Sequence, residues 1–244
     1  MERRGLSGST LKLIAIITML IDHIGAGILG RFLNIEHWQN ESLLQAYLVM
    51  RNIGRIAFPI FCFLLVEGFL HTSDRKKYAL RLGAFALISE VPFDLAFNSK
   101  VVEFGYQNVF FTLFLGLLTV AAYHELAEKK VQWNSWVRIL AGILVVLLGM
   151  GVAELLRTDY GALGVLAVMV LYILRNRRMV QAAVGYLYFC SWEPTSLPAF
   201  ILIAVYNGKR GWKLKYFFYA FYPVHLLLIY LICLGMGIAG NAAV

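Results

Sequence analysis

Apolar runs close to 20 residues long recur along the whole chain, and short polar segments separate them. A helix rises 1.5 Å per residue and satisfies its own backbone hydrogen bonds, so a run of this length can span a bilayer. The pattern predicts an all-α polytopic integral membrane protein with about nine transmembrane helices. The seventh and eighth are short for a span and can be tilted, re-entrant or merged. The expected helices cover residues 11–30, 53–71, 79–97, 107–124, 136–153, 160–175, 179–190, 195–207 and 216–238.

The basic residues alternate between the two sides of this arrangement. With the N-terminus in the cytoplasm, 17 of the 22 Lys and Arg residues fall in inner segments and 5 in outer segments. Cytoplasmic loops collect Lys and Arg, so the bias predicts a cytoplasmic N-terminus. The longest loop, over about 31–50, is then expected at the outer interface. The first apolar run is interpreted as a retained helix, and the location as a bacterial cytoplasmic (inner) membrane.

Composition supports one integral membrane domain over residues 1–244. Hydrophobic residues make up 60% of the chain and charged residues 15%, against about 25% charged in a soluble domain. The net charge of +8 is explained by basic cytoplasmic loops, and nucleic acid is not expected as a partner. The three cysteines lie in apolar runs without metal-ligand spacing, so neither a disulfide framework nor a metal is expected.

Two ionisable residues, Asp22 and His23, stand side by side near the middle of the first expected helix. A charge at bilayer depth costs roughly 2.5–3.5 kcal/mol on insertion scales and by default marks a functional site. Arg51 and Arg55 are expected at the outer end of the second helix, on one face because of their i, i+4 spacing. Two structural readings stay open here: an ion pair between Asp22 and Arg55, and a neutral core histidine at position 23. The two arginines can equally snorkel to the interface or clamp an anion.

Other polar residues fall into two layers. Glu90 and Asp94 lie one turn apart in the third helix, as partners for arginines or as acid–base groups. Asn108 and Asp159 are expected on the outer side with them. The cytoplasmic layer holds Glu67, His71, Arg81, Lys209, Arg210, Lys213, Lys215, Tyr222 and His225.

These residue types can support group transfer across the membrane. A histidine beside a carboxylate at low dielectric can act as a general base, and arginines can stabilise an oxyanion. Basic residues on the cytoplasmic side can hold the phosphates of a nucleotide-like donor. A proton-coupled transporter uses the same residue types, so the residues alone leave both functions open.

Seven strings occur in one order over nearly the whole chain: LKLIAIITMLIDHIGA (11–26), RNIGRIAFPIFCFLLVEGF (51–69), ALISEVPFDLAF (86–97), QNVFFTLFLGLL (107–118), DYGALGVL (159–166), YNGKRG (206–211) and KYFFYAFYPVHLLLIYLI (215–232). Together they resemble the TraX family. That family takes its name from a conjugation protein that N-acetylates pilin subunits, and it is similar to larger transmembrane acyltransferases.

The resemblance implies an acetyltransferase with acetyl-CoA as donor. His23 becomes the candidate catalytic histidine, Asp22 its electrostatic support, and Arg51 and Arg55 match an RxxxR pattern of the family. Glu90, Asp94, Asn108 and Asp159 are assigned acid–base or orienting roles. The cytoplasmic layer is assigned to acetyl-CoA binding.

The acceptor is left open by the resemblance: a peptide N-terminus or a glycan, at the outer side of the bilayer. Two rival functions are a proton-coupled transporter using Asp22, Glu90 and His225 as a relay, and a non-enzymatic scaffold. The transporter is disfavoured by the lack of a visible inverted repeat of broken helices. Homo-oligomer formation is left open.

Overall fold

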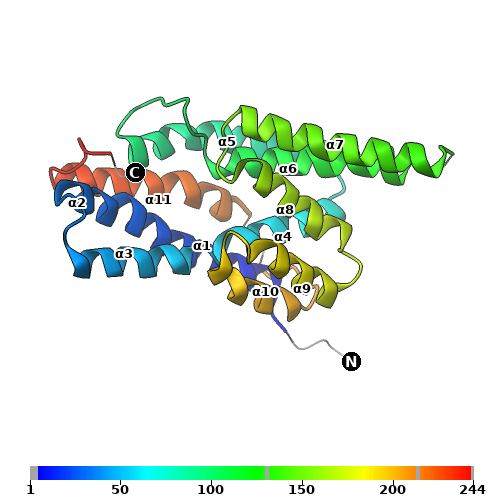
Figure 1. Ribbon diagram of the computed structural model, residues 1–244, viewed down its shortest axis with the longest axis horizontal. Helices are drawn as coiled ribbons and strands as arrows, with labels where there is room; N and C mark the ends of the chain where they lie inside the picture. The colour runs from blue at the N-terminus through cyan, green and yellow to red at the C-terminus, as the bar shows by residue number, and fades with distance from the viewer. Residues whose placement is uncertain (1–4, 130–131, 213–214, 243–244) are drawn as a thin grey trace. The chain divides into compact units, whose positions relative to one another are not determined.

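The computed structural model describes residues 5–129, 132–212 and 215–242, and these residues fold into helices (Figure 1). Each of the nine ranges expected to be helical holds a helix, which confirms the all-helical fold class. In chain order the elements are α1 (Gly8–Ile24), the π-helix η1 (Gly25–Leu29), α2 (Gly30–Ile35), α3 (Glu41–Gly54), α4 (Ala57–His71), α5 (Arg75–Asn98), α6 (Val109–Tyr123), the π-helix η2 (His124–Glu128), α7 (Ser135–Leu155), α8 (Gly161–Ile173), α9 (Arg178–Phe189), the 3-10 helix η3 (Pro194–Ser196), α10 (Leu197–Ala204) and α11 (Lys215–Gly235).

Five helical stretches in the described part of the chain are long and apolar enough to cross a membrane. They are Gly8–Ile35, Glu41–His71, Val109–Glu128, Ser135–Leu155 and Phe217–Gly235. The count of nine spans and the cytoplasmic N-terminus stay predictions.

The chain divides into two compact units. The first comprises Met1–Phe61, Ile88–Glu103 and Tyr186–Val244, and the second comprises Cys62–Leu87 and Phe104–Gly185. The prediction of one domain over residues 1–244 stays a prediction.

The prediction of a loop over 31–50 is wrong. The first helix continues through η1 and α2 to Ile35, and α3 begins at Glu41. Asn40 caps α3, since its side chain accepts a hydrogen bond from the backbone N–H of Leu43 at 3.0 Å. Within the first unit α3 packs against α1 in the opposite direction, so the two form a helical hairpin (Figure 1).

A break separates α3 from α4 at Arg55–Ile56. Pro59 explains it, because proline cannot donate a backbone hydrogen bond and its ring clashes with the carbonyl four residues earlier, that of Arg55. The sequence predicted one continuous helix over 53–71. The break instead lets Arg51 and Arg55 point to different partners.

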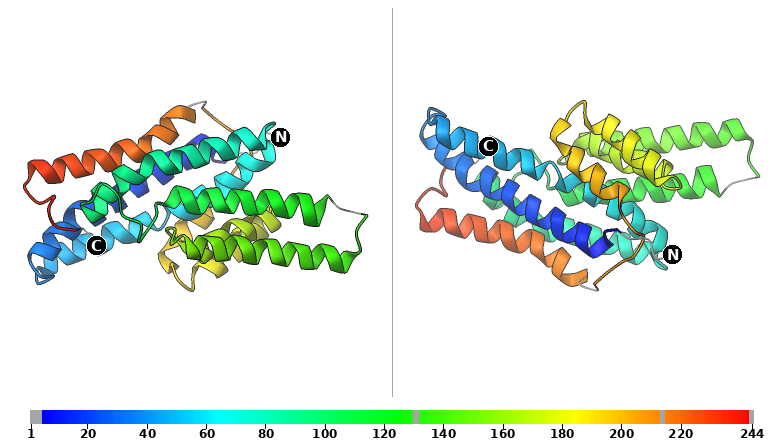
Figure 2. Two further views of the ribbon diagram at one scale, coloured as in Figure 1. Left: turned by 90° about the horizontal axis from the view of Figure 1, so that it is seen from above. Right: turned by 90° about the horizontal axis from the view of Figure 1, so that it is seen from below.

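In the first unit α11 packs along α1 in the same direction (Figure 2). Gly27 allows this approach, since a Cβ atom there would lie 2.7 Å from the side chain of Ile229. One helical turn further, the guanidinium of Arg31 is fully buried. It donates to backbone carbonyls of Gly27 and Ala96, among others, at 2.6–2.7 Å. These carbonyl oxygens provide hydrogen-bond acceptors for the N–H groups of the buried guanidinium.

The second unit contains a bundle of α6, α7 and α8, which pack pairwise against one another (Figure 2). Asp74 caps the start of α5, since its carboxylate accepts a hydrogen bond from the backbone N–H of Lys77 at 2.9 Å. This bond lowers the pKa of the Asp74 carboxyl. The negative carboxylate also interacts favourably with the positive, N-terminal end of the helix dipole, which stabilises the start of α5 at this position.

Candidate functional site

An ion pair joins α1 to α3 at the centre of the first unit. Arg51 Nη1 donates to Asp22 Oδ2 at 2.7 Å. Gly54 allows this approach, because a Cβ atom there would clash with the Cβ, Cγ and Oδ1 atoms of Asp22. Gly25 has the same role at the start of η1, three residues after Asp22, where a Cβ atom would lie 2.9 Å from that of Met50. The ion pair thus depends on small residues in both helices.

His23 lies next to this pair and contacts a second histidine. Its Nε2 is 3.9 Å from Asp22 Oδ2, and its Nδ1 is 2.7 Å from Nε2 of His225 in α11. The rings of Phe97 and Tyr222 meet the His23 ring edge-on, at centroid distances of 5.4 and 5.8 Å. The side chains of Asp22 and His23 are largely buried, with 15% and 13% of their surface exposed.

The placement of His225 in a cytoplasmic layer apart from His23 is therefore wrong. His225 follows the first residue of α11 by ten positions, which corresponds to about 15 Å along the helix. It lies near the middle of the helix rather than at its start. Tyr222, one turn earlier, also faces the histidines, with its ring centroid 5.6 Å from that of His225.

Arg55 has a partner that the sequence analysis missed. Its Nη1 donates to Glu193 Oε1 at 2.8 Å, and the Glu193 side chain is 6% exposed. An ion pair of Asp22 with Arg55 was one of the alternatives left open, and the structure pairs Asp22 with Arg51 instead. The signal for Glu193 was available: it is an acid before a proline, between two apolar runs.

Among the described residues, the carboxylate of Asp94 is held by backbone and amide donors rather than by an arginine. Asp94 is fully buried in α5, and its carboxylate accepts hydrogen bonds from the backbone N–H of Glu103 at 2.7 Å and from Asn98 at 3.5 Å. Asp94 therefore fixes the loop after α5. Glu90 lies one turn earlier, half-buried.

Asn108 and Asp159 belong to the second unit and order its backbone. Asn108 caps α6 through Phe110 N and donates to the carbonyl of Ala86 at 2.8 Å. Asp159 accepts from the hydroxyl of Tyr106. These bonds give both residues a structural role within their unit.

The residues assigned to acetyl-CoA lie in several places. In the second unit, Glu67 Oε1 accepts from Arg178 at 3.2 Å, and His71 Nδ1 donates to the carbonyl of Glu67 at 2.8 Å. The guanidinium of Arg81 lies 5.9 Å from the ring of Tyr78. Lys213 lies outside the described residues, as does the side chain of Lys215.

Lys209 and Arg210 lie at the N-terminus of α1, in the first unit. Their carbonyls accept hydrogen bonds from Gly8 N at 2.8 Å and Ser9 N at 3.0 Å. Lys12 follows one turn later. The first backbone N–H groups of α1 are thus bonded within the chain, while the side chains of Lys209 and Arg210 are exposed beside them.

A partly buried polar cluster in the second unit was also missed. The carboxylate of Glu128 in η2 accepts hydrogen bonds from the hydroxyl of Tyr172 at 2.9 Å and from Arg175 at 3.0 Å. His124 Nδ1 lies 3.0 Å from the same carboxylate. The cluster ties the ends of α6 and α8 together. A π-helix gives no clear periodic signal, so this pairing could not be expected from spacing.

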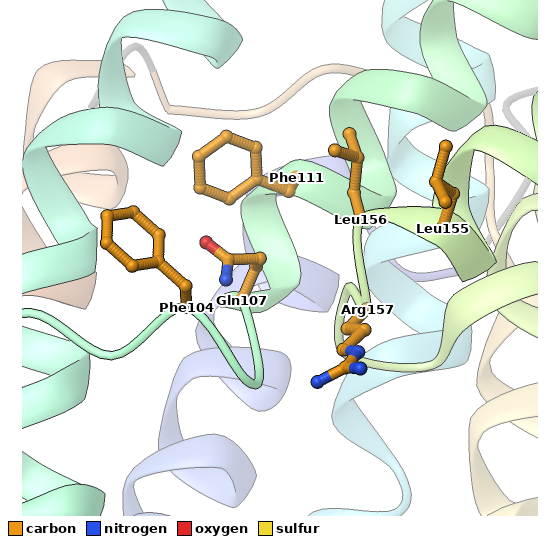
Figure 3. Close-up of a pocket in the computed structure, with 6 residues that line it drawn as sticks. All are labelled: Phe104, Gln107, Phe111, Leu155, Leu156 and Arg157. Atoms are coloured by element: carbon orange, nitrogen blue, oxygen red, sulfur yellow. The ribbon is translucent and has the colours of Figure 1, made fainter.

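A groove of about 410 Å³ also lies in the second unit, between the loop before α6 and the end of α7. Phe104, Gln107, Phe111, Leu155, Leu156 and Arg157 line it (Figure 3). Gln107 N donates to the carbonyl of Arg157 at 2.9 Å, which holds the two loops together. Within the ranges that the structure describes, no group of His, Cys, Asp and Glu could hold a metal ion.

Comparison with known families bears directly on this site. Residues 7–233 match the family described as TraX protein. The chain belongs to the TraX family. The matched range includes Asp22, His23, Arg51, Arg55 and His225, so the resemblance of the sequence strings to this family is confirmed.

A relative of this chain is the probable fimbrial assembly protein FimC, serogroup H1, of Dichelobacter nodosus. It is 31% identical over 253 residues, which cover 91% of this chain and 94% of the relative. No solved structure matches the chain. The TraX assignment therefore rests on sequence over nearly the full length of both proteins.

Proposed function

We propose that this protein is a membrane-embedded acetyltransferase. It moves an acetyl group from cytosolic acetyl-CoA to an amine or hydroxyl at the outer side of the membrane. The observation that carries the proposal is the line formed by Arg51, Asp22 and His23, in which one carboxylate oxygen binds a guanidinium and lies 3.9 Å from an imidazole nitrogen. Ionisable residues within helices long enough to span a membrane indicate a functional site. Membership of the TraX family supports acyl transfer as its function.

The reaction needs one proton carrier. The acceptor nitrogen or oxygen attacks the thioester carbonyl carbon while His23 Nε2 takes the acceptor's proton. The tetrahedral intermediate then expels the CoA sulfur, and His23 returns the proton to the thiolate. An N–C or O–C bond forms, the C–S bond breaks, and CoA leaves as the thiol.

Arg51 is the residue best placed to stabilise the oxyanion. A guanidinium has five N–H donors, and the 2.7 Å bond to Asp22 engages only Nη1. Arg51 shares Asp22 Oδ2 with His23, so its charge lies beside the reacting nitrogen. Arg55 supports the α3–α4 break through its ion pair with Glu193.

The donor is proposed to dock at the basic N-terminal end of α1. The phosphates of acetyl-CoA need several cationic donors, and the proposal assigns Lys12, Lys209 and Arg210 to this role. Glu67, His71 and Arg81 belong to the second unit, and their assignment to acetyl-CoA binding stays a prediction.

The acceptor class is suggested by the relative. FimC of Dichelobacter nodosus carries the description of a probable fimbrial assembly protein. We therefore take an amine of a fimbrial subunit as the first acceptor to test, with a glycan hydroxyl as the second.

One observation favours a second function. The 2.7 Å distance between His23 and His225 can pass a proton from ring to ring, which a proton-coupled transporter also requires. A transporter would take up solute under a pH gradient and would not consume acetyl-CoA.

The proposal is tested in cells that lack their own copy of the protein and carry the native chain or His23→Ala. Fimbrial subunits and other envelope proteins are analysed by mass spectrometry for added acetyl groups. Because removal of a general base costs about 10²–10⁴-fold in rate, acetylation should be present with the native chain and absent with His23→Ala.

His37→Asn is the matched control. His37 is an exposed histidine with a left-handed backbone (φ 49°), which asparagine tolerates. This variant should acetylate like the native chain. Equal acetylation with His23→Ala, at equal membrane abundance, would refute the role of His23.

A further inference from the structure

His225 makes a second contact that determines where its own proton lies. Its Nδ1 is 2.7 Å from the backbone carbonyl oxygen of Phe221. A carbonyl oxygen only accepts hydrogen bonds, so His225 Nδ1 must carry a hydrogen.

The other nitrogen of His225 then has a fixed role. The side chain is 4% exposed and lies among aromatic rings, with Phe221 stacked at a centroid distance of 4.8 Å and Tyr222 edge-on. Such surroundings favour the neutral ring, which has a single N–H. His225 Nε2 is therefore a hydrogen-bond acceptor.

This acceptor selects the tautomer of His23. With His225 Nε2 accepting at 2.7 Å, His23 Nδ1 must be the donor. The two ring planes are within 5° of parallel, and their centroids are 5.0 Å apart, about the sum of the 2.7 Å contact and the two distances from ring centre to nitrogen. The bond therefore lies in the plane of both rings. The proton of His23 is then on Nδ1, and its Nε2 keeps a lone pair near Asp22 and Arg51.

We propose that His225 is a positioning residue that holds His23 in the Nδ1–H tautomer, with Nε2 as the reactive nitrogen. This role rests on the proposed acetyl transfer. His225 takes the place of the carboxylate that commonly orients a catalytic histidine. When Nε2 takes the acceptor's proton, His23 becomes a cation and its Nδ1–H bond to His225 becomes charge-assisted and stronger. No further proton has to move.

The tautomer is measured by nitrogen-15 NMR of protein with labelled histidine in detergent, because protonated and unprotonated ring nitrogens have well-separated shifts. The signal of His23 is identified by its loss in His23→Gln. We expect a protonated Nδ1 and an unprotonated Nε2. A native protein with the proton on His23 Nε2 would overturn the inference.

Two variants separate positioning from packing. His225→Gln keeps an amide oxygen near the position of Nε2 that can accept from His23, so the His23 tautomer and most of the activity should remain. His225→Ala should shift His23 toward the Nε2–H tautomer and lower kcat by about 10–100-fold, as for other groups that orient a functional histidine. An unchanged His23 tautomer in His225→Ala, or equal losses in both variants, would contradict the role.

His71 serves as a control in the same spectra. Its Nδ1 donates to the carbonyl of Glu67 at 2.8 Å, so it should show the Nδ1–H tautomer in every variant. The spectra also distinguish the two proposals. A protein with the expected His23 tautomer but no acetyl transfer would refute the proposed function alone, whereas acetyl transfer with the opposite tautomer would refute this inference alone.

Discussion

At the scale of single residues, the centre of the first unit is a line of polar side chains that compensate one another. Arg51 neutralises Asp22 at 2.7 Å, and His23 contacts His225 at the same distance. An isolated charge at membrane depth is costly, and a pair that also makes hydrogen bonds is much less so. The arrangement leaves one imidazole nitrogen, Nε2 of His23, facing the ion pair.

The two arginines should contribute unequally to activity. Arg51→Lys removes the additional guanidinium N–H donors beside His23 and should lower kcat by about 10²–10³-fold, the usual cost of losing a donor to an oxyanion. Arg55→Lys should cost less than about 10-fold, because a lysine ammonium can keep an ion pair with Glu193. Acetyl-CoA turnover of the two purified variants measures the difference. Equal losses would show that the RxxxR pair acts as one unit.

The sequence allowed the site to be predicted only in part. Asp22 and His23 stand out because a charged residue within an apolar run has no ordinary explanation. Their partners could not be derived, because Pro59 breaks the helix at Arg55 and directs the two arginines apart. His225 was assigned to the wrong depth, since its distance from the helix start was underestimated.

At the scale of helices, the close approach of α1 and α3 depends on Gly54. Gly54→Ala places a methyl group against Asp22, so the helices must separate or Asp22 must turn away from Arg51. Overpacking of this kind costs about 1–3 kcal/mol. We expect a lower thermal unfolding midpoint together with a loss of acetyl transfer.

Gly151→Ala in α7 is the matched control, since a Cβ atom there meets nothing within 4 Å. Alanine is the better helix former, so stability and activity should be unchanged or slightly higher. Native-like activity in Gly54→Ala would mean that the Asp22–Arg51 contact is not required.

The element that the sequence analysis missed is α3. Its first half mixes polar and apolar residues, with Glu41, Ser42 and Gln45 among leucines, and it therefore resembles an interfacial loop. The local signal for a helix was present in Asn40, a preferred N-cap residue directly before an acidic first turn. Packing against α1 then stabilises a helix of modest hydrophobicity.

At the scale of the whole molecule, an all-helical membrane protein could be predicted because apolar run length is a direct physical requirement of the bilayer. Five described stretches satisfy that requirement, and the TraX family match covers residues 7–233. The number of spans and the orientation depend on short helices such as α9 and α10. Those features are set by packing and by the bilayer together.

The central claim is that the chain consumes acetyl-CoA through His23. The most direct measurement is binding and turnover of acetyl-CoA by purified protein in detergent, native against His23→Ala, with folding checked by thermal unfolding. The account predicts binding by both proteins and turnover by the native protein alone. Equal turnover, or no binding of acetyl-CoA by either folded protein, would contradict it.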